Sequence, residues 1–194
     1  MLFDEPVAQI QVNLSRWVGA GKVVQLRRGR YILAEEFWYR APSIYYISNY
    51  LYRPSYVSLH SALEFHGFIP EATGIIQAVT PRQTQRWSTP MGTFQYRSIK
   101  KERFFGYQKY SLKETDSHSK QTSFFMAVPE KALLDLFYLL QGEWTIQRIE
   151  EMRFQNLQEL NFAKFQDYAT QFNSPKVERA AHHFLNLNFR AVMT

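Results

Sequence analysis

The stretch LSRWVGAGKVVQLRRGRYIL, residues Leu14–Leu33, contains the clearest structural signal in the chain. It predicts the end of a helix, a break at Gly19 and Gly21, and a tight two-stranded hairpin with Gly29 in its turn. Three arginines surround that turn: Arg27, Arg28 and Arg30. Like charges facing each other across a hairpin are destabilising, so the cluster favours an external polyanion that compensates them. A helix followed by a basic hairpin is the chain order of a winged helix-turn-helix, which binds DNA.

The helix before the hairpin supplies further predicted DNA contacts. Its apolar residues recur at intervals of three and four between Val7 and Val18, as in an amphipathic helix. Asn13 and Arg16 are predicted base contacts, because asparagine matches adenine edges and arginine matches guanine edges. The predicted phosphate contacts are Ser15, Lys22, Arg27, Arg28 and Arg30. The simpler alternative is that these polar side chains only face solvent.

Residues 1–40 are therefore predicted to form a small DNA-binding unit. A complete helix-turn-helix needs a helix upstream of the recognition helix, and only Met1–Pro6 precede it here. We expect a shortened winged helix, in which the first helix is missing or is replaced by a partner subunit or a later helix.

Composition narrows the class of protein further. Of the 194 residues, 45% are hydrophobic and 16% are aromatic, which is enough for a substantial core. The absence of cysteine excludes disulfides, cysteine zinc sites and thiol catalysis. No apolar run approaches the roughly 20 residues of a membrane helix, and the N-terminus does not resemble a secretory signal. We expect a cytoplasmic protein that does not bind membranes.

Residues 41–194 are predicted to form an α+β domain, in which a mixed sheet is followed by a helical C-terminal portion. Strand patterns cover Ile75–Thr80, Thr93–Ile99, Phe104–Leu112 and Ser123–Val128. The sequence between the last two strands, Lys113–Gln121, is polar and is predicted to be a loop.

Helical patterns occur on both sides of these strands. Before them we expect helices at Ser43–Leu51 and at a short segment ending at Phe65, capped by Ser58 or Ser61. After them, Pro129 starts a helix that is apolar nearly all round over Ala132–Leu140, which places it in the core. Three amphipathic helices follow: Thr145–Phe154, Leu160–Phe172 and Lys176–Leu187.

The segment Arg82–Lys113 is strongly basic, with eight positive residues and a single negative one, whereas the whole chain has a net charge of +6. Cations among aromatic residues are typical of surfaces that bind RNA or single strands. A second basic surface is predicted from Arg97, Lys100, Lys101 and Arg103. It leaves open an alternative function, an RNA-binding or nucleic-acid-processing enzyme. Ordinary strand patterning, with aromatic residues inside and lysines outside, is the simpler explanation.

The sequence contains no recognisable catalytic, metal or cofactor motif. Glu130, Lys131 and Asp135 could suggest the carboxylates of a metal-dependent nuclease. Helix-terminus electrostatics and an ion pair explain them more simply. His60 and His66 do not have the i, i+4 spacing of a helical metal pair. We predict a non-enzymatic protein with no catalytic residue, metal or cofactor.

Three segments together resemble one family. They are LSRWVGAGKVVQLRRGRYIL (14–33), SYVSLHSALEFHGFIPE (55–71) and AVPEKALLDLFYL (127–139). Their order and spacing resemble the AbiEi antitoxins of type IV toxin–antitoxin systems and related predicted transcriptional regulators. The resemblance extends from about Gln11 to Leu140, and more loosely over the helical tail.

The resemblance implies an N-terminal winged helix that binds operator DNA at inverted repeats and represses its own operon. It also implies a C-terminal domain that counteracts a nucleotidyltransferase-like toxin. Inverted repeats would suit a homodimer. The expected function is that of an antitoxin-type transcriptional regulator.

Overall fold

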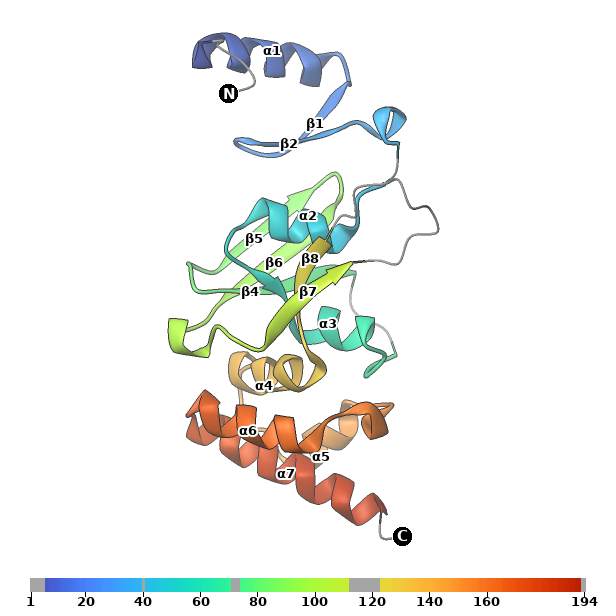
Figure 1. The fold of residues 1–194 in the computed structure, drawn as a ribbon, viewed down its shortest axis with the longest axis vertical. Coiled ribbons are helices and arrows are strands. Elements are labelled where there is room, and N and C mark those ends of the chain that lie inside the picture. The colour runs from blue at the N-terminus through green and yellow to red at the C-terminus, as the bar shows by residue number, and fades with distance from the viewer. Residues whose placement is uncertain (1–5, 40, 71–73, 112–122, 193–194) are drawn as a thin grey trace.

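A computed structural model describes residues 6–39, 41–70, 74–111 and 123–192. Figure 1 shows an elongated molecule with its first helix and its C-terminal helices at opposite ends. The first helix and the hairpin form as predicted: α1 (Val7–Gly19), β1 (Val23–Arg27) and β2 (Arg30–Leu33). The polar segment Lys113–Gln121, predicted to be a loop, lies outside the described residues.

The centre of the molecule is a six-stranded mixed sheet in the order β5-β6-β4-β3-β8-β7. Parallel pairs join β4 to β6 and β3 to β8, and the other neighbours are antiparallel. Its strands are β3 (Tyr56–Val57), β4 (Ile75–Thr80), β5 (Gln85–Thr89), β6 (Gly92–Ser98), β7 (Tyr107–Ser111) and β8 (Ser123–Ala127). The predicted mixed α+β architecture is confirmed, whereas β5 was not predicted.

The helices are close to their predicted positions. They are α2 (Ile44–Leu51), α3 (Leu59–Phe65), α4 (Pro129–Leu139), α5 (Ile146–Glu151), α6 (Phe162–Phe172) and α7 (Pro175–Val192). Short 3-10 turns occur at η1 (Glu35–Phe37), η2 (Lys101–Arg103) and η3 (Leu157–Glu159). Pro129 occupies the first turn of α4, where its missing N–H costs nothing.

The described residues form two hydrophobic cores around the sheet. The larger core joins the sheet to α3, α4 and the C-terminal helices, which form the lower layers in Figure 1. The smaller core lies under α2 and contains Ile47, Leu51, Phe94 and Tyr96. Leu26 of the hairpin is buried in this smaller core as well. The hairpin is therefore packed on residues that follow it in the chain, across the boundary that separates residues 1–40 from 41–194.

The larger core contains a buried ion pair. Lys131 and Asp135 lie one turn apart on α4 and form a salt bridge, with both side chains fully buried. Asp135 Oδ2 accepts hydrogen bonds from Tyr56 Oη at 3.0 Å and from Ser58 Oγ at 2.8 Å. Lys131 Nζ also donates to Tyr56 Oη at 3.0 Å. Burial raises the pKa of Asp135 and lowers the pKa of Lys131, and the attraction between the two charges opposes both shifts.

The predicted capping of α3 by a serine side chain is wrong. Ser58 occupies the N-cap position, but its hydroxyl donates to Asp135 and makes no capping bond. Ser61 lies inside α3, where its hydroxyl donates to Ile75 O and accepts from Gln77 N. Both hydroxyls therefore join α3 to neighbouring elements.

We expect Asp135→Asn to lower the free energy of unfolding by about 3–5 kcal/mol, because it leaves the ammonium of Lys131 buried without its counterion. Urea denaturation followed by circular dichroism measures this change. The double variant Lys131→Met/Asp135→Asn removes both charges and should recover a large part of the lost free energy of unfolding. An Asp135→Asn protein as stable as the wild type would contradict this account of the pair.

Candidate nucleic-acid interface

The helix α1 lies at one end of the molecule, beyond the hairpin (Figure 1). None of its residues is buried, and its main tertiary contact is with β1. Trp17, on the apolar side predicted from the sequence, is 48% exposed. Gly21, at φ +69°, turns the chain so that Lys22 N donates to Trp17 O at 2.9 Å. The hairpin therefore begins directly beneath the last turn of the helix.

The predicted contacts on α1 differ in exposure. Ser15 and Arg16 are exposed, and Asn13 is half-buried. Asn13 Oδ1 accepts a hydrogen bond from Gln9 Nε2 at 3.3 Å, one turn earlier. Arg16 is in the last turn, where a positive charge interacts favourably with the helix dipole. The two predicted base contacts remain predictions.

The hairpin places like charges opposite each other. Arg27 and Arg30 are register partners across the two strands, and Gly29 turns the chain with φ +73°. Arg28, at the tip, is exposed. In the described part of the chain, none of the three arginines forms a salt bridge. Among the described residues, no acidic side chain therefore neutralises these three arginines.

Two of the three arginines have internal partners that the sequence did not reveal. Arg27 donates to Leu51 O from Nε at 3.0 Å and from Nη2 at 2.8 Å, and its guanidinium lies 4.7 Å from the ring centroid of Trp87. The guanidinium of Arg30 lies 5.0 Å from the ring centroid of Tyr50. These contacts assign Arg27 to the attachment of the hairpin, and its contact with phosphate stays a prediction. Arg28 and Lys22 are the exposed cations of the hairpin.

The second predicted basic surface is divided by the fold. Arg103 donates to Phe172 O at 2.7 Å, to Asn173 O at 2.6 Å and to Tyr138 Oη at 2.8 Å. It thus joins η2 to α4 and the end of α6, and we remove it from the predicted surface. Lys100 and Lys101 are exposed, and Arg97 is half-buried.

The rest of the basic segment supports the simpler explanation, in which aromatic residues of the strands point inward and lysines point outward. Phe94 and Tyr96 are fully buried, whereas Lys109 on β7 is exposed. The guanidinium of Arg82 lies 4.5 Å from the ring centroid of Tyr52, so this cation also has an internal partner. The segment is therefore not one continuous cationic face.

The acidic and histidine residues have structural partners. Glu130 accepts a hydrogen bond from Asn161 N at 3.1 Å and pairs with Lys164 at 3.5 Å. Its neighbours Lys131 and Asp135 form the predicted ion pair. His66 Nε2 bonds Ala127 O at 2.9 Å, and burial lowers the pKa of this imidazole. Within the described ranges, no group of three or more histidine and acidic side chains could hold a metal ion.

Comparison with models of protein families and with the sequences of curated proteins gives no match. Among the helices of the described residues, none has both the length and the apolar character needed to cross a membrane.

The two arginines beside the turn should respond differently to substitution. We expect Arg27→Gln to lower the free energy of unfolding by about 1–3 kcal/mol, because it removes charge-assisted hydrogen bonds to Leu51 O. Arg28→Gln is the matched control and should change stability by no more than about 0.5 kcal/mol, as an exposed substitution. Thermal and urea denaturation measure both values. Equal stability of the two variants would show that Arg27 does not fasten the hairpin.

Proposed function

We propose that this protein is a DNA-binding transcriptional regulator of the antitoxin type. The observation that carries the proposal is the end of the molecule formed by α1 and the hairpin. There an exposed helix is followed by a hairpin whose turn presents an exposed arginine, Arg28, and no acidic residue of the described chain pairs with the hairpin arginines. A cationic end of this kind suits the phosphates of a duplex.

Each residue has a proposed role at this end. Asn13 and Arg16 read base edges in the major groove, while Arg28, Lys22 and Ser15 contact phosphates. Arg30, whose guanidinium lies over the ring of Tyr50, adds positive charge that attracts the DNA phosphates. Arg27 positions the hairpin through Leu51. The similarity of the three sequence segments to the AbiEi antitoxins supports the same function.

The remaining parts of the proposal concern partners. Residues 41–194 supply the activity that opposes a nucleotidyltransferase-like toxin, and the protein works in the cytoplasm without an enzymatic reaction of its own. A homodimer would place two hairpins on the inverted repeats of an operator. A continuous RNA-binding surface over the whole basic segment is disfavoured, because Arg82 and Arg103 are used inside the fold.

The contribution of Arg28 can be tested by fluorescence anisotropy with a duplex from the promoter of the protein's own operon. We expect Arg28→Ala to weaken binding to every duplex and to reduce the slope of log K against log salt by about 0.9, because one phosphate contact is lost. Lys101→Ala, an exposed lysine on η2, is the matched control and should bind like the wild type. Identical salt slopes for Arg28→Ala and the wild type would exclude this contact.

The role of Asn13 is tested by sequence preference. We expect Asn13→Ala to reduce the free-energy difference between the promoter duplex and a scrambled duplex by about 1–3 kcal/mol, since one base contact is lost. Binding to the scrambled duplex should change little. If the wild type binds duplex, single-stranded DNA and RNA with equal affinity, the regulator proposal fails.

A further inference from the structure

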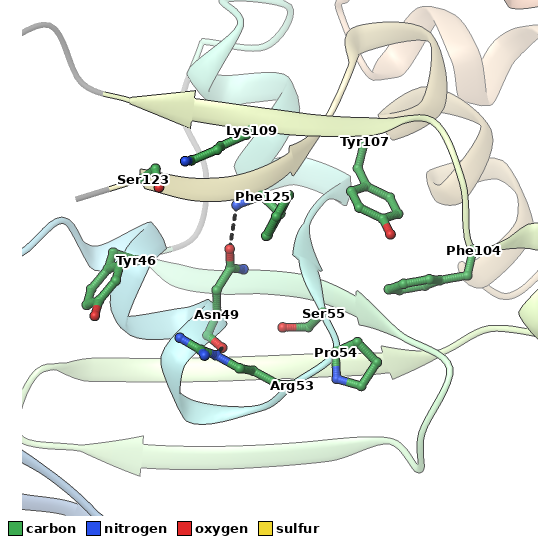
Figure 2. A pocket seen from close by; sticks show the side chains of 10 residues that line it. All are labelled: Tyr46, Asn49, Arg53, Pro54, Ser55, Phe104, Tyr107, Lys109, Ser123 and Phe125. Atoms are coloured by element: carbon green, nitrogen blue, oxygen red, sulfur yellow. Dashed lines mark hydrogen bonds between the residues drawn. The ribbon is translucent and has the colours of Figure 1, made fainter. Parts of the chain in front are cut away.

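A pocket of about 530 Å³ lies between α2 and the outer strands β7 and β8 (Figure 2). Its volume is within the range of small-molecule sites. No residue of α1 or of the hairpin lines it, so it is separate from the proposed DNA-binding surface. The side chains that line it come from α2, from the segment after α2, from Phe104 directly after η2, and from β7 and β8.

A buried donor in the wall of this pocket has no hydrogen-bond partner in the described part of the chain. Asn49, on α2, is only 6% exposed. Its Oδ1 accepts a hydrogen bond from Phe125 N on β8, as the dashed line in Figure 2 shows. Since this bond fixes the amide oxygen toward β8, the orientation of the amide nitrogen is fixed as well. Asn49 Nδ2 has no hydrogen-bond partner among the described residues. A buried donor in this state is stabilised by any acceptor that enters the pocket.

The pocket is positively charged. Arg53 and Lys109 both line it and both are exposed, and none of the described residues that line it is acidic. Arg53 Nε donates to Asn49 O at 3.4 Å, which holds this arginine beside the amide. A guanidinium and an ammonium near an unpaired amide donor favour an anion rich in acceptors, such as a phosphate.

Aromatic rings form the remainder of the pocket. Phe125 is 46% exposed and Tyr107 is 37% exposed, and their ring centroids lie 5.8 Å apart in an edge contact. Behind them, Tyr107 stacks on the buried Tyr56 with ring centroids 4.7 Å apart. Tyr46 and Phe104 complete the aromatic lining in Figure 2. Exposed rings held in this way are suited to stacking with nucleobases.

We propose that this pocket binds a nucleotide. The base lies against Phe125 and Tyr107, the phosphate lies between Arg53 and Lys109, and an acceptor of the ligand bonds Asn49 Nδ2. The same chemistry is offered by a free mononucleotide and by an unpaired nucleotide within a strand. The proposal goes beyond operator binding, since it concerns a different surface and a different ligand.

Calorimetric titration of the full chain with AMP and UMP tests the proposal. Adenosine, which lacks the phosphate, and ribose 5-phosphate, which lacks the base, should bind about tenfold more weakly or worse, because each loses one set of contacts. A short oligouridylate separates the two sources of nucleotide. Binding of AMP or UMP indicates a free nucleotide, and binding of the oligomer alone indicates a nucleotide within a strand.

Variants locate the site. Lys109→Gln should weaken the binding of whichever nucleotide probe binds the wild type about tenfold, because it removes a charge-assisted contact. Asn49→Asp should weaken it at least as much, because it keeps an acceptor for Phe125 N but replaces the free donor with a carboxylate oxygen. Lys101→Gln and Arg28→Ala are the controls and should bind like the wild type. Because Lys109 is exposed, its variant remains informative even if Asn49→Asp fails to fold.

The proposal is overturned if none of the nucleotide probes binds at millimolar concentration. It is also overturned if Lys109→Gln binds with wild-type affinity, or if Arg28→Ala removes the binding. Loss of operator binding in Arg28→Ala with intact nucleotide binding would show that the two surfaces act separately.

Discussion

The ion pair between Lys131 and Asp135 connects the parts of this fold. Two charges without water are stable only where hydrogen bonds replace their hydration, and here Tyr56 and Ser58 provide them. These two residues come from β3 and from the start of α3, whereas the charges are on α4. The position of α4 against the sheet is therefore specified by polar geometry, and the C-terminal helices pack on α4 in turn.

The backbone at Gly106 also packs closely against the buried ion pair. Gly106 has φ +70°, and a Cβ atom on it would lie 2.8 Å from Cγ of Lys131. The chain before β7 can therefore pass over the lysine only with glycine at this position. The buried pair thus constrains residues from four segments of the sequence.

Local patterns predicted most of the helices and strands, because burial on one face imposes a period that can be read along the chain. The strand β5 was missed since QRWST contains one large apolar residue, Trp87, and forms an edge of the sheet. The serines of α3 matched a capping pattern, but their hydroxyls bond residues distant in the sequence. Long-range hydrogen bonds leave no periodic signal.

The candidate site was predictable only in part, because its residues contact groups that are distant in the sequence. The sequence shows three clustered arginines, and their mutual repulsion predicts compensation by an external polyanion. Part of the compensation is internal, from the ring of Trp87, the ring of Tyr50 and the carbonyl of Leu51. These groups are 20 or more residues away from the hairpin arginines they contact, so spacing could not reveal them. Asn49 and the pocket on β7 and β8 were missed because their residues converge only in the folded chain.

The helix α2 contacts both the arginine hairpin and the outer strand β8. Its last residue, Leu51, holds the hairpin through Arg27, and Asn49, two positions earlier, bonds the backbone of β8. An eight-residue helix moves as a rigid body, so a tilt that displaces one of these contacts displaces the other. A movement of the hairpin at Arg27 should therefore also move β8, because Leu51 and Asn49 are only two residues apart on α2.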